Sequence, residues 1–206
     1  MKATIRNLLA AIFIAASFQT HAQGFIYDQQ STNPPSTFGD YLDIQTAPLT
    51  QSFIPTFSAI KFVQFVLLDL PNTGNNGATV YVNLWTGSPN INYNSATLLG
   101  STTPVFMPDG FGWGVPGVTN FDFSTAIALT PGQTYYLQPV VQSGDNPFYI
   151  SDPGPTYPNG QLFVSGEAFN TDLWFREGVV VPEPTTLALM GISVILVCLQ
   201  ARRYRQ

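Results

Sequence analysis

Short apolar runs, each ended by glycine, proline, asparagine or aspartate, fill the middle of the chain and constrain its fold most. No stretch between residues 23 and 181 keeps the period of about 3.6 residues that a helix needs. The clearest run, 78–85, alternates, so one face of a strand would carry Ala78, Val80, Val82 and Leu84. The other face would carry Thr79, Tyr81, Asn83 and Trp85. The pattern predicts β-strands.

The same signals predict further strands along the chain. With 78–85, the predicted strands are 24–28, 50–54, 59–70, 97–101, 118–123, 134–141, 147–151, 161–164 and 173–180. The segment 59–70 is apolar on both faces, which predicts a central strand covered on each side. Short strands at this spacing predict an all-β fold, a two-sheet antiparallel jelly-roll sandwich.

The first 22 residues have the pattern of a secretory signal peptide. Lys2 and Arg6 precede the apolar stretch 8–18, and small residues lead up to Ala22. We therefore expect the secretory translocon to export the chain and signal peptidase to cleave it after Ala22.

The last 26 residues have the pattern of a membrane anchor. A turn-forming motif at 181–184 is followed by an apolar segment at 185–201, roughly 25 Å of helix. That length lies at the short end of what a bilayer needs. The basic tail 202–206 contains Arg202, Arg203 and Arg205, which favour the cytoplasmic side. One C-terminal transmembrane helix is predicted, with the domain 23–180 on the exported side.

In order and spacing, the motif Val181-Pro182-Glu183-Pro184, the apolar helix and the arginine cluster resemble the PEP-CTERM protein-sorting signal. The resemblance implies an inner-membrane-anchored precursor whose Pro182, Glu183 and Pro184 are recognised by an exosortase-type enzyme. It also implies a final place at the cell surface or in an extracellular matrix of exopolysaccharide or biofilm. It covers only the C-terminal tail and implies nothing about the exported domain.

The exported region is acidic. Between residues 23 and 181 it has two basic residues, Lys61 and Arg176, and eleven acidic ones, a formal charge of −9. Such a surface repels phosphate groups, which argues against nucleic acid and anionic lipid as partners.

The exported region also has neither histidine nor cysteine, because His21 lies in the signal peptide and Cys198 in the apolar tail. This excludes a Ser-His-Asp triad, a Cys-His dyad and zinc sites of histidine or cysteine. It also excludes disulfides, so the core alone must stabilise the domain. We expect no enzymatic activity and no cofactor other than a structural cation.

Several short segments of the exported region resemble those of galactose-binding-like and carbohydrate-binding-module sandwiches. They are Gln51-Ser52-Phe53, the strand 80–85, Leu98-Leu99-Gly100-Ser101, the segment 129–137 and Asp172-Leu173-Trp174-Phe175-Arg176. The resemblance supports the jelly roll and suggests polysaccharide as a ligand.

Three functions are compatible with these patterns. The first is a non-enzymatic surface or matrix protein, and the second is a carbohydrate-binding module that stacks aromatic rings on sugars. Candidate rings are Trp85, Tyr93, Trp113, Tyr149 and Tyr157, although for any one of them a place in the core or in turn packing is the simpler interpretation. The third is a glycoside hydrolase with two carboxylates. A row of aromatics on one sheet face would favour the second, and a cleft with two facing carboxylates the third.

A structural calcium site is a further expectation, which the galactose-binding-like resemblance implies where first and last strands meet. Asp28 ends the first predicted strand and Asp172 precedes the last. Paired strands could bring both carboxylates to one calcium ion, completed by carbonyl oxygens and water.

Overall fold

The computed structural model describes residues 23–32, 41–44, 47–69, 76–87, 96–115, 117–144 and 148–182. These residues form thirteen strands and no helix. The strands are β1 (Gln23–Ser31), β2 (Tyr41–Asp43), β3 (Leu49–Phe53), β4 (Ala59–Asp69), β5 (Ala78–Thr86), β6 (Thr97–Ser101), β7 (Val105–Met107), β8 (Gly117–Ala128), β9 (Tyr135–Gly144), β10 (Phe148–Ser151), β11 (Leu162–Val164), β12 (Glu167–Phe169) and β13 (Phe175–Pro182). The main body is Ile26–Val179, and residues 23–25 and 180–182 group with the chain ends as a second unit.

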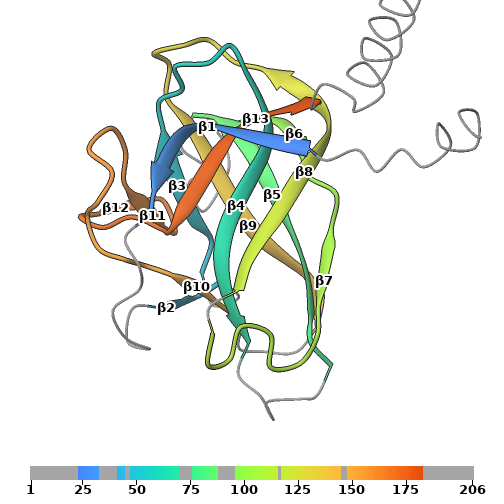
Figure 1. The fold of residues 1–206 in the computed structure, drawn as a ribbon. Coiled ribbons are helices and arrows are strands. Elements are labelled where there is room, and N and C mark those ends of the chain that lie inside the picture. Colours follow the sequence, from blue (N-terminus) through green and yellow to red (C-terminus); the bar gives the residue numbers. More distant parts are fainter. Residues whose placement is uncertain are drawn as a thin grey trace, which may run out of the picture. The chain divides into compact units, whose positions relative to one another are not determined.

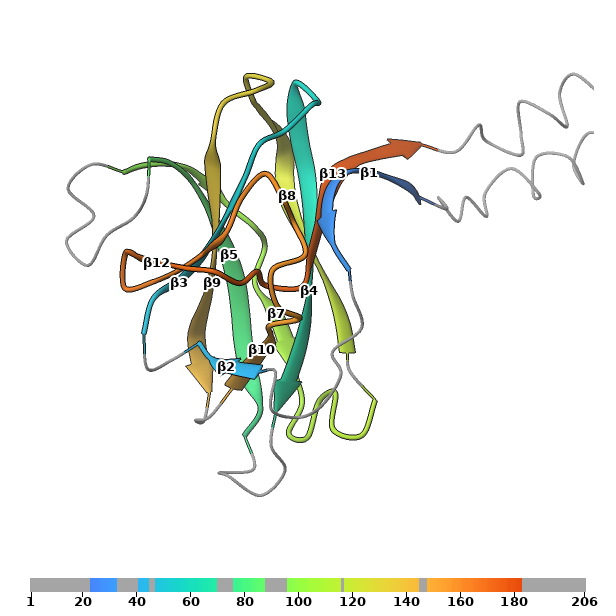
Figure 2. The same ribbon diagram turned by 90° about the vertical axis from the view of Figure 1, so that its left-hand side faces the viewer.

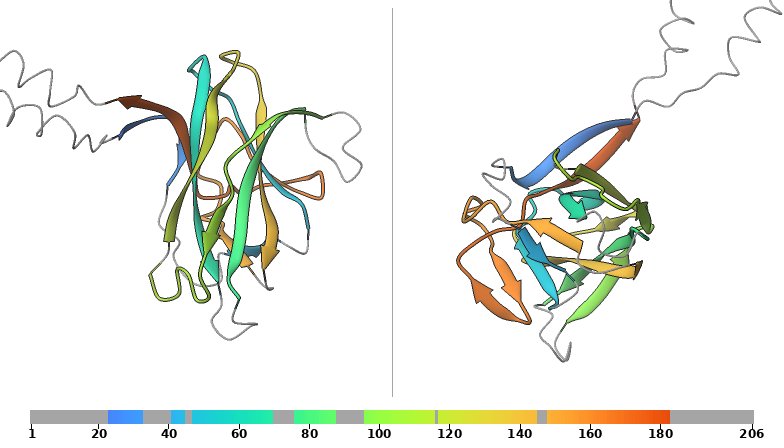
Figure 3. Two further views of the ribbon diagram at one scale, coloured as in Figure 1. Left: turned by 90° about the vertical axis from the view of Figure 1, so that its right-hand side faces the viewer. Right: turned by 90° about the horizontal axis from the view of Figure 1, so that it is seen from below.

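The strands form two sheets, seen as layers in Figure 2. We call the six-stranded sheet, with the order β1-β13-β4-β10-β2 and with β8 also on β4, sheet A. Sheet B has seven strands in the order β12-β11-β3-β9-β5-β6, and β7 also pairs with β5. The two further views in Figure 3 agree that β4 and β8 lie in one layer and β5 and β9 in the other. The predicted all-β sandwich is confirmed.

The order of the main strands is that of a jelly roll. Sheet A contains β1, β13, β4 and β8 side by side, and sheet B contains β3, β9, β5 and β6 (Figure 1). The chain therefore passes between the layers, from β1 to β3, to β4, to β5, and later from β8 to β9. This is the double Greek key of an eight-stranded jelly roll, extended by short additional strands.

The alternation in β5 places its apolar residues in the core as predicted. Ala78, Val80, Val82 and Leu84 are buried between the sheets, whereas Tyr81 on the other face is half-buried. The core is completed by residues of both sheets, including Ile60, Phe65, Leu67, Phe121, Leu137 and Phe175. The predicted face assignment is confirmed, and it decides which side chains sheet B presents outward.

Strand β4 is central in sheet A and is covered on both faces, as its sequence predicts. Phe65 and Leu67 belong to the core between the sheets, and Phe62 on the opposite face is also buried. The ring of Tyr27 packs edge-on against Phe62, with 5.6 Å between the centroids. The guanidinium of Arg176 lies 5.1 Å from the centre of the Tyr27 ring and extends the cover.

No helix in the described part of the chain has the length and hydrophobicity of a membrane span. The predicted signal peptide 1–22 and transmembrane helix 185–201 lie outside the described residues.

Val82→Asp should abolish cooperative folding, because Val82 is fully buried and an unpaired charge in an apolar core costs several kcal/mol. Tyr81→Ser on the half-buried face should lower the free energy of unfolding by about 1 kcal/mol. Thermal and denaturant unfolding of both variants tests this, and equal destabilisation would contradict the face assignment.

Candidate functional site

An apolar row crosses the outer face of sheet B, obliquely at its β11 end, where Phe163 is level with Thr50 of β3 and Tyr136 with Ser52. We use this name for Phe163, Tyr136, Trp85 and Leu98, which come from β11, β9, β5 and β6. Trp85 stands opposite Tyr136 on one side and Leu98 on the other. The rings of Tyr136 and Phe163 meet edge to face, with centroids 5.5 Å apart. Four strands thus contribute apolar side chains to the row, and β3, which lies between β11 and β9, contributes the polar residues Thr50 and Ser52.

Core packing determines that the aromatic side chains of this row point outward. Each aromatic residue of the row has a chain neighbour that is buried between the sheets, namely Leu84, Leu137 and Leu162. Successive residues of a strand point to opposite faces, so the aromatic residues must point outward. The three rings are half-buried, and Leu98 is 47 % exposed. The row is therefore accessible yet held by its neighbours.

A second, polar row lies beside the apolar row. We call Gln138, Asn83 and Ser101, which also stand opposite one another across β9, β5 and β6, the amide row. The indole N–H of Trp85 donates to Gln138 Oε1 at 2.9 Å, and Asn83 Nδ2 donates to the same oxygen at 3.3 Å. Ser101 Oγ donates to Asn83 Oδ1 at 2.6 Å. These bonds fix the tilt of the Trp85 ring and bring amide and hydroxyl groups to the same face.

The named residues of both rows are uncharged. Burial raises the pKa of the Tyr136 hydroxyl above its usual value, so this group remains a neutral hydrogen-bond donor at physiological pH. Aromatic rings with polar tips, next to fixed amides, suit a ligand that has both apolar faces and hydroxyl groups. Sugars have this combination of surfaces.

Of the predicted ligand-binding residues that the structure describes, only Trp85 lies in this face. Trp113 is 52 % exposed, but it follows β7, which pairs with the beginning of β5, whereas Trp85 lies near the end of β5. The structure therefore does not bring these two rings together, and Tyr93 lies outside the described residues.

The loop that carries Trp113 is firmly attached to β4. Gly110 N–H donates to Asp69 Oδ2 at 3.0 Å, and Asp69 N–H donates to the Phe111 carbonyl at 2.7 Å. Gly112 has a φ of +74°, and a Cβ there would lie 2.5 Å from the Leu67 carbonyl oxygen. This glycine-rich loop thus holds an exposed ring in a defined position.

Tyr157 is a core residue, which was the alternative that the sequence left open. Its side chain is buried, and its ring meets Phe175 edge to face at 5.3 Å. Its hydroxyl donates to Gln29 Oε1 and accepts a bond from Ile54 N–H. Desolvation raises the pKa of Tyr157 to about 12. Tyr149, in β10, is half-buried in sheet A.

Asp28 anchors the loop between β3 and β4. Its Oδ2 accepts the backbone N–H groups of Thr56 and Phe57, each at 2.8 Å, and its Oδ1 accepts the Thr56 hydroxyl. Gln29 Nε2 also donates to Oδ1, at 3.0 Å.

Asp172 anchors the segment after β10 in the same manner. Its Oδ2 accepts the backbone N–H groups of Thr156 and Tyr157, each at 2.8 Å, and its Oδ1 accepts Gln51 Nε2 at 2.8 Å. Gln51 in turn accepts the Leu173 N–H at 2.7 Å. This buried network ties β3 of sheet B to the residues that lead into β13 of sheet A.

The first and last strands are neighbours, as the calcium prediction assumed. The oxygens of Asp28 and Asp172, however, face N–H and O–H donors, which a calcium ion would have to displace. Among the described residues, no group of three or more histidine, cysteine, aspartate and glutamate residues could hold a metal ion. The arrangement favours a structural role for both aspartates, and the calcium site stays a prediction.

The C-terminal end of the chain carries the sorting information. Residues 180–203 match the PEP-CTERM protein-sorting motif. The motif marks an exported protein with a membrane-associated precursor that an exosortase processes. The predicted sorting signal is confirmed. No curated protein matches the chain.

The matched motif begins within β13, which ends at Pro182. Pro182, the first of the recognition residues, is therefore also the last residue of β13. Glu183, Pro184, the cluster Arg202, Arg203 and Arg205, and the cleavage residue Ala22 lie outside the described residues, and their roles stay predictions.

The protonation of Glu177 in β13 is strongly perturbed by burial. Glu177 is fully buried, and the one polar neighbour that lowers its pKa, to a minor extent, is the backbone of Gln29. Desolvation, and to a lesser degree the Asp28 carboxylate, raise the pKa of Glu177 to about 9. The group is therefore protonated in the folded protein at neutral pH.

Wild-type stability should fall as the pH rises from 4.5 to about 9, because the unfolded chain releases this proton while the folded protein retains it. Glu177→Gln keeps the shape of the neutral form. It should flatten this dependence and raise the free energy of unfolding at pH 7, at most on the order of 3 kcal/mol. Urea unfolding at several pH values measures the effect. Glu167→Gln, in the exposed strand β12, is the matched control, and the same change in both variants would contradict the assignment.

Proposed function

We propose that the exported sandwich is a non-enzymatic protein of the cell surface or extracellular matrix that binds polysaccharide through the outer face of sheet B. The observation that carries the proposal is the apolar row, in which three aromatic residues and Leu98 line up across the sheet beside hydrogen-bonding amides. Aromatic rings stack on the apolar faces of sugar rings, and the exposed Ser101 of the amide row can supply a partner for a hydroxyl group.

The dimensions of the face suit a chain rather than a single sugar. From β11 to β6 the row crosses four intervals between strands, roughly 19 Å at the usual strand spacing. That length accommodates several sugar units in line. The fixed Trp85 ring and buried amides also reduce the side-chain entropy that binding would otherwise lose.

The export signal and the charge of the domain support the same conclusion. A protein sorted by a PEP-CTERM signal leaves the cytoplasm, and polysaccharide is abundant at bacterial surfaces. The formal charge of −9 and the uncharged residues of both rows favour a neutral glycan over an acidic one.

A purely structural role and a glycoside hydrolase are the alternatives. A hydrolase needs two carboxylates at the sugar, and neither row contains one. Asp28 and Asp172 are engaged with loop N–H groups, as described above. A purely structural role would leave the apolar row without a ligand, and the following experiment separates these possibilities.

Trp85→Leu and Tyr136→Leu each keep apolar bulk but remove a stacking ring, so they should weaken binding to matrix polysaccharide from the producing bacterium about tenfold or more. Affinity electrophoresis in gels with and without the polysaccharide measures the loss. Trp113→Leu is the control, since it removes an exposed ring elsewhere. If the polysaccharide retards both row variants as much as the wild-type protein, or if only Trp113→Leu loses this retardation, the outer face of sheet B is not the binding site.

The mature protein should begin near Gln23 and lack the segment 185–201 after cleavage close to Pro182-Glu183-Pro184. Intact-mass measurement on protein from the native host tests this. A mature chain that still contains residues 202–206 would show that the tail is only an anchor. Glu183→Ala should leave the precursor unprocessed, whereas Glu167→Ala in β12 should not affect processing.

A further inference from the structure

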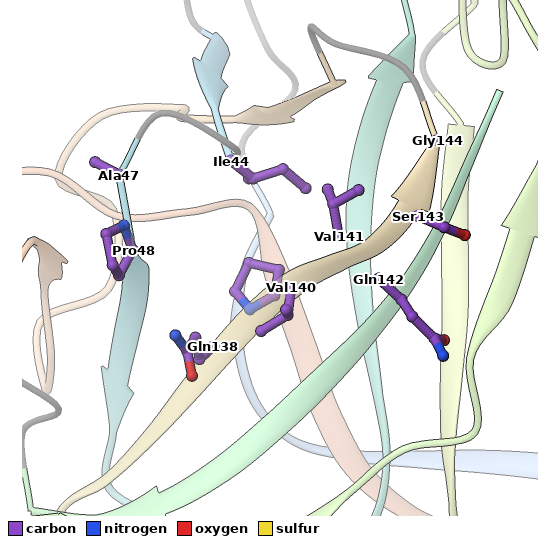
Figure 4. A pocket seen from close by; sticks show the side chains of 10 residues that line it. Ile44, Ala47, Pro48, Gln138, Val140, Val141, Gln142, Ser143 and Gly144 are labelled. Carbon is purple, nitrogen blue, oxygen red and sulfur yellow. The ribbon is translucent and has the colours of Figure 1, made fainter. Parts of the chain in front are cut away.

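A side pocket opens next to the amide row, with a volume of about 450 Å³ (Figure 4). It lies along the stretch of β9 from Gln138 to Gly144, and Ala47, Pro48 and Ile44 form its opposite wall. We call this space the side pocket. Its volume lies within the range of ordinary small-ligand sites.

The pocket exists because β3 is shorter than β9. β3 pairs with β9 only from Gln51 opposite Leu137 to Phe53 opposite Tyr135. Along its other edge, β9 pairs with β5 as far as Gly144. Beyond Leu137, among the described residues, one edge of β9 therefore borders the pocket in place of a strand.

The chemistry of the pocket is neutral and mixed. Gln138, Gln142 and Ser143 bring polar groups, while Pro48 and Val140 bring apolar surface. Figure 4 shows the side chains of Ile44 and Val141 pointing toward one another, and both residues also contact the core. None of the described residues that line the pocket is charged. A neutral group with several hydroxyls fits this lining better than an ion or an apolar ligand.

Gln138 connects the pocket to the proposed binding face. Its Oε1 accepts the Trp85 and Asn83 hydrogen bonds, and the same residue lines the pocket. A glycan along the apolar row would run across the strands, whereas the pocket extends along β9. A sugar branch that is attached to the glycan's main chain above Tyr136 and extends past Gln138 would therefore enter the pocket.

We infer that the side pocket binds a neutral monosaccharide side branch of the polysaccharide whose main chain lies on the apolar row. This inference rests on the proposed function and adds the class of ligand: a branched neutral glycan. The apolar row would then supply affinity for the main chain, and the pocket would supply preference for the branch.

Isothermal titration with matched oligosaccharides tests the inference. The pairs are mannohexaose and a galactosyl-substituted mannooligosaccharide, xylohexaose and an arabinosyl-substituted xylooligosaccharide, and cellohexaose and a xyloglucan oligosaccharide. We expect the wild-type protein to bind the branched member of one pair about tenfold more tightly than the linear member.

Three variants locate the preference. Ser143→Trp places a large side chain at an exposed pocket residue, so it should reduce affinity for the branched ligand to that for the linear one. Ser124→Trp, at an exposed serine of β8, is the matched control and should change neither affinity. Tyr136→Leu should weaken both. Circular dichroism verifies that each variant is folded.

The possible outcomes distinguish the side pocket from the binding face on sheet B. Equal affinity for branched and linear ligands, or branch preference that survives Ser143→Trp, would overturn the side pocket but leave the binding face intact. Failure of the wild-type protein to bind every ligand of the set would count against both the face and the pocket.

Discussion

Leu84 and Leu137 are fully buried between the two sheets, and their position decides what the protein presents to its surroundings. Because adjacent residues of a strand point in opposite directions, burying these two leucines places Trp85 and Tyr136 on the outer face. The pairing of β5 with β9 then sets the two rings opposite each other. The proposed binding face is thus a consequence of core packing, and a register shift of one residue would eliminate it.

Polar contacts between loops and strands help to stabilise this exported domain, which has no cysteine. Asp28 and Asp172 each accept two backbone N–H groups from a loop, and Gln51 connects β3 to the segment before β13. The bonds between Asp172, Tyr157, Gln51 and Leu173 are buried, so they are costly to break, because each would leave an unsatisfied group in the interior. The same loops contain residues that flank β3 and β11, so the network also positions one end of sheet B.

The strands could be predicted because alternation is a local property of the sequence. The segment 97–101 matches β6 in full, and the predicted 59–70 differs from β4 by one residue. Three strands of three residues each, β2, β7 and β12, were not predicted, because such short segments show no period. These short segments are strands because they pair with longer strands, which the local sequence does not reveal.

The candidate site was predicted less completely. The outward direction of Trp85 followed from the pattern of 78–85, but its neighbours did not, because Tyr136 and Phe163 reach it only through the pairing of distant strands. Tyr157 was also a candidate in the sequence, but it is buried, and its hydroxyl donates to Gln29. For Asp28 and Asp172, the adjacency of first and last strands was foreseen. The loop N–H groups that occupy their oxygens were not, since turn conformation determines where those groups point.

The most direct test of the account is nuclear magnetic resonance of the ¹⁵N-labelled domain during titration with the polysaccharide oligomer that binds best. The account predicts that the largest shift changes occur at the indole N–H of Trp85 and the side-chain amides of Asn83 and Gln138. Backbone changes should follow β5, β6 and β9. Changes centred on the Trp113 loop, or spread over sheet A with sheet B unaffected, would contradict the claim that the outer face of sheet B is the binding surface.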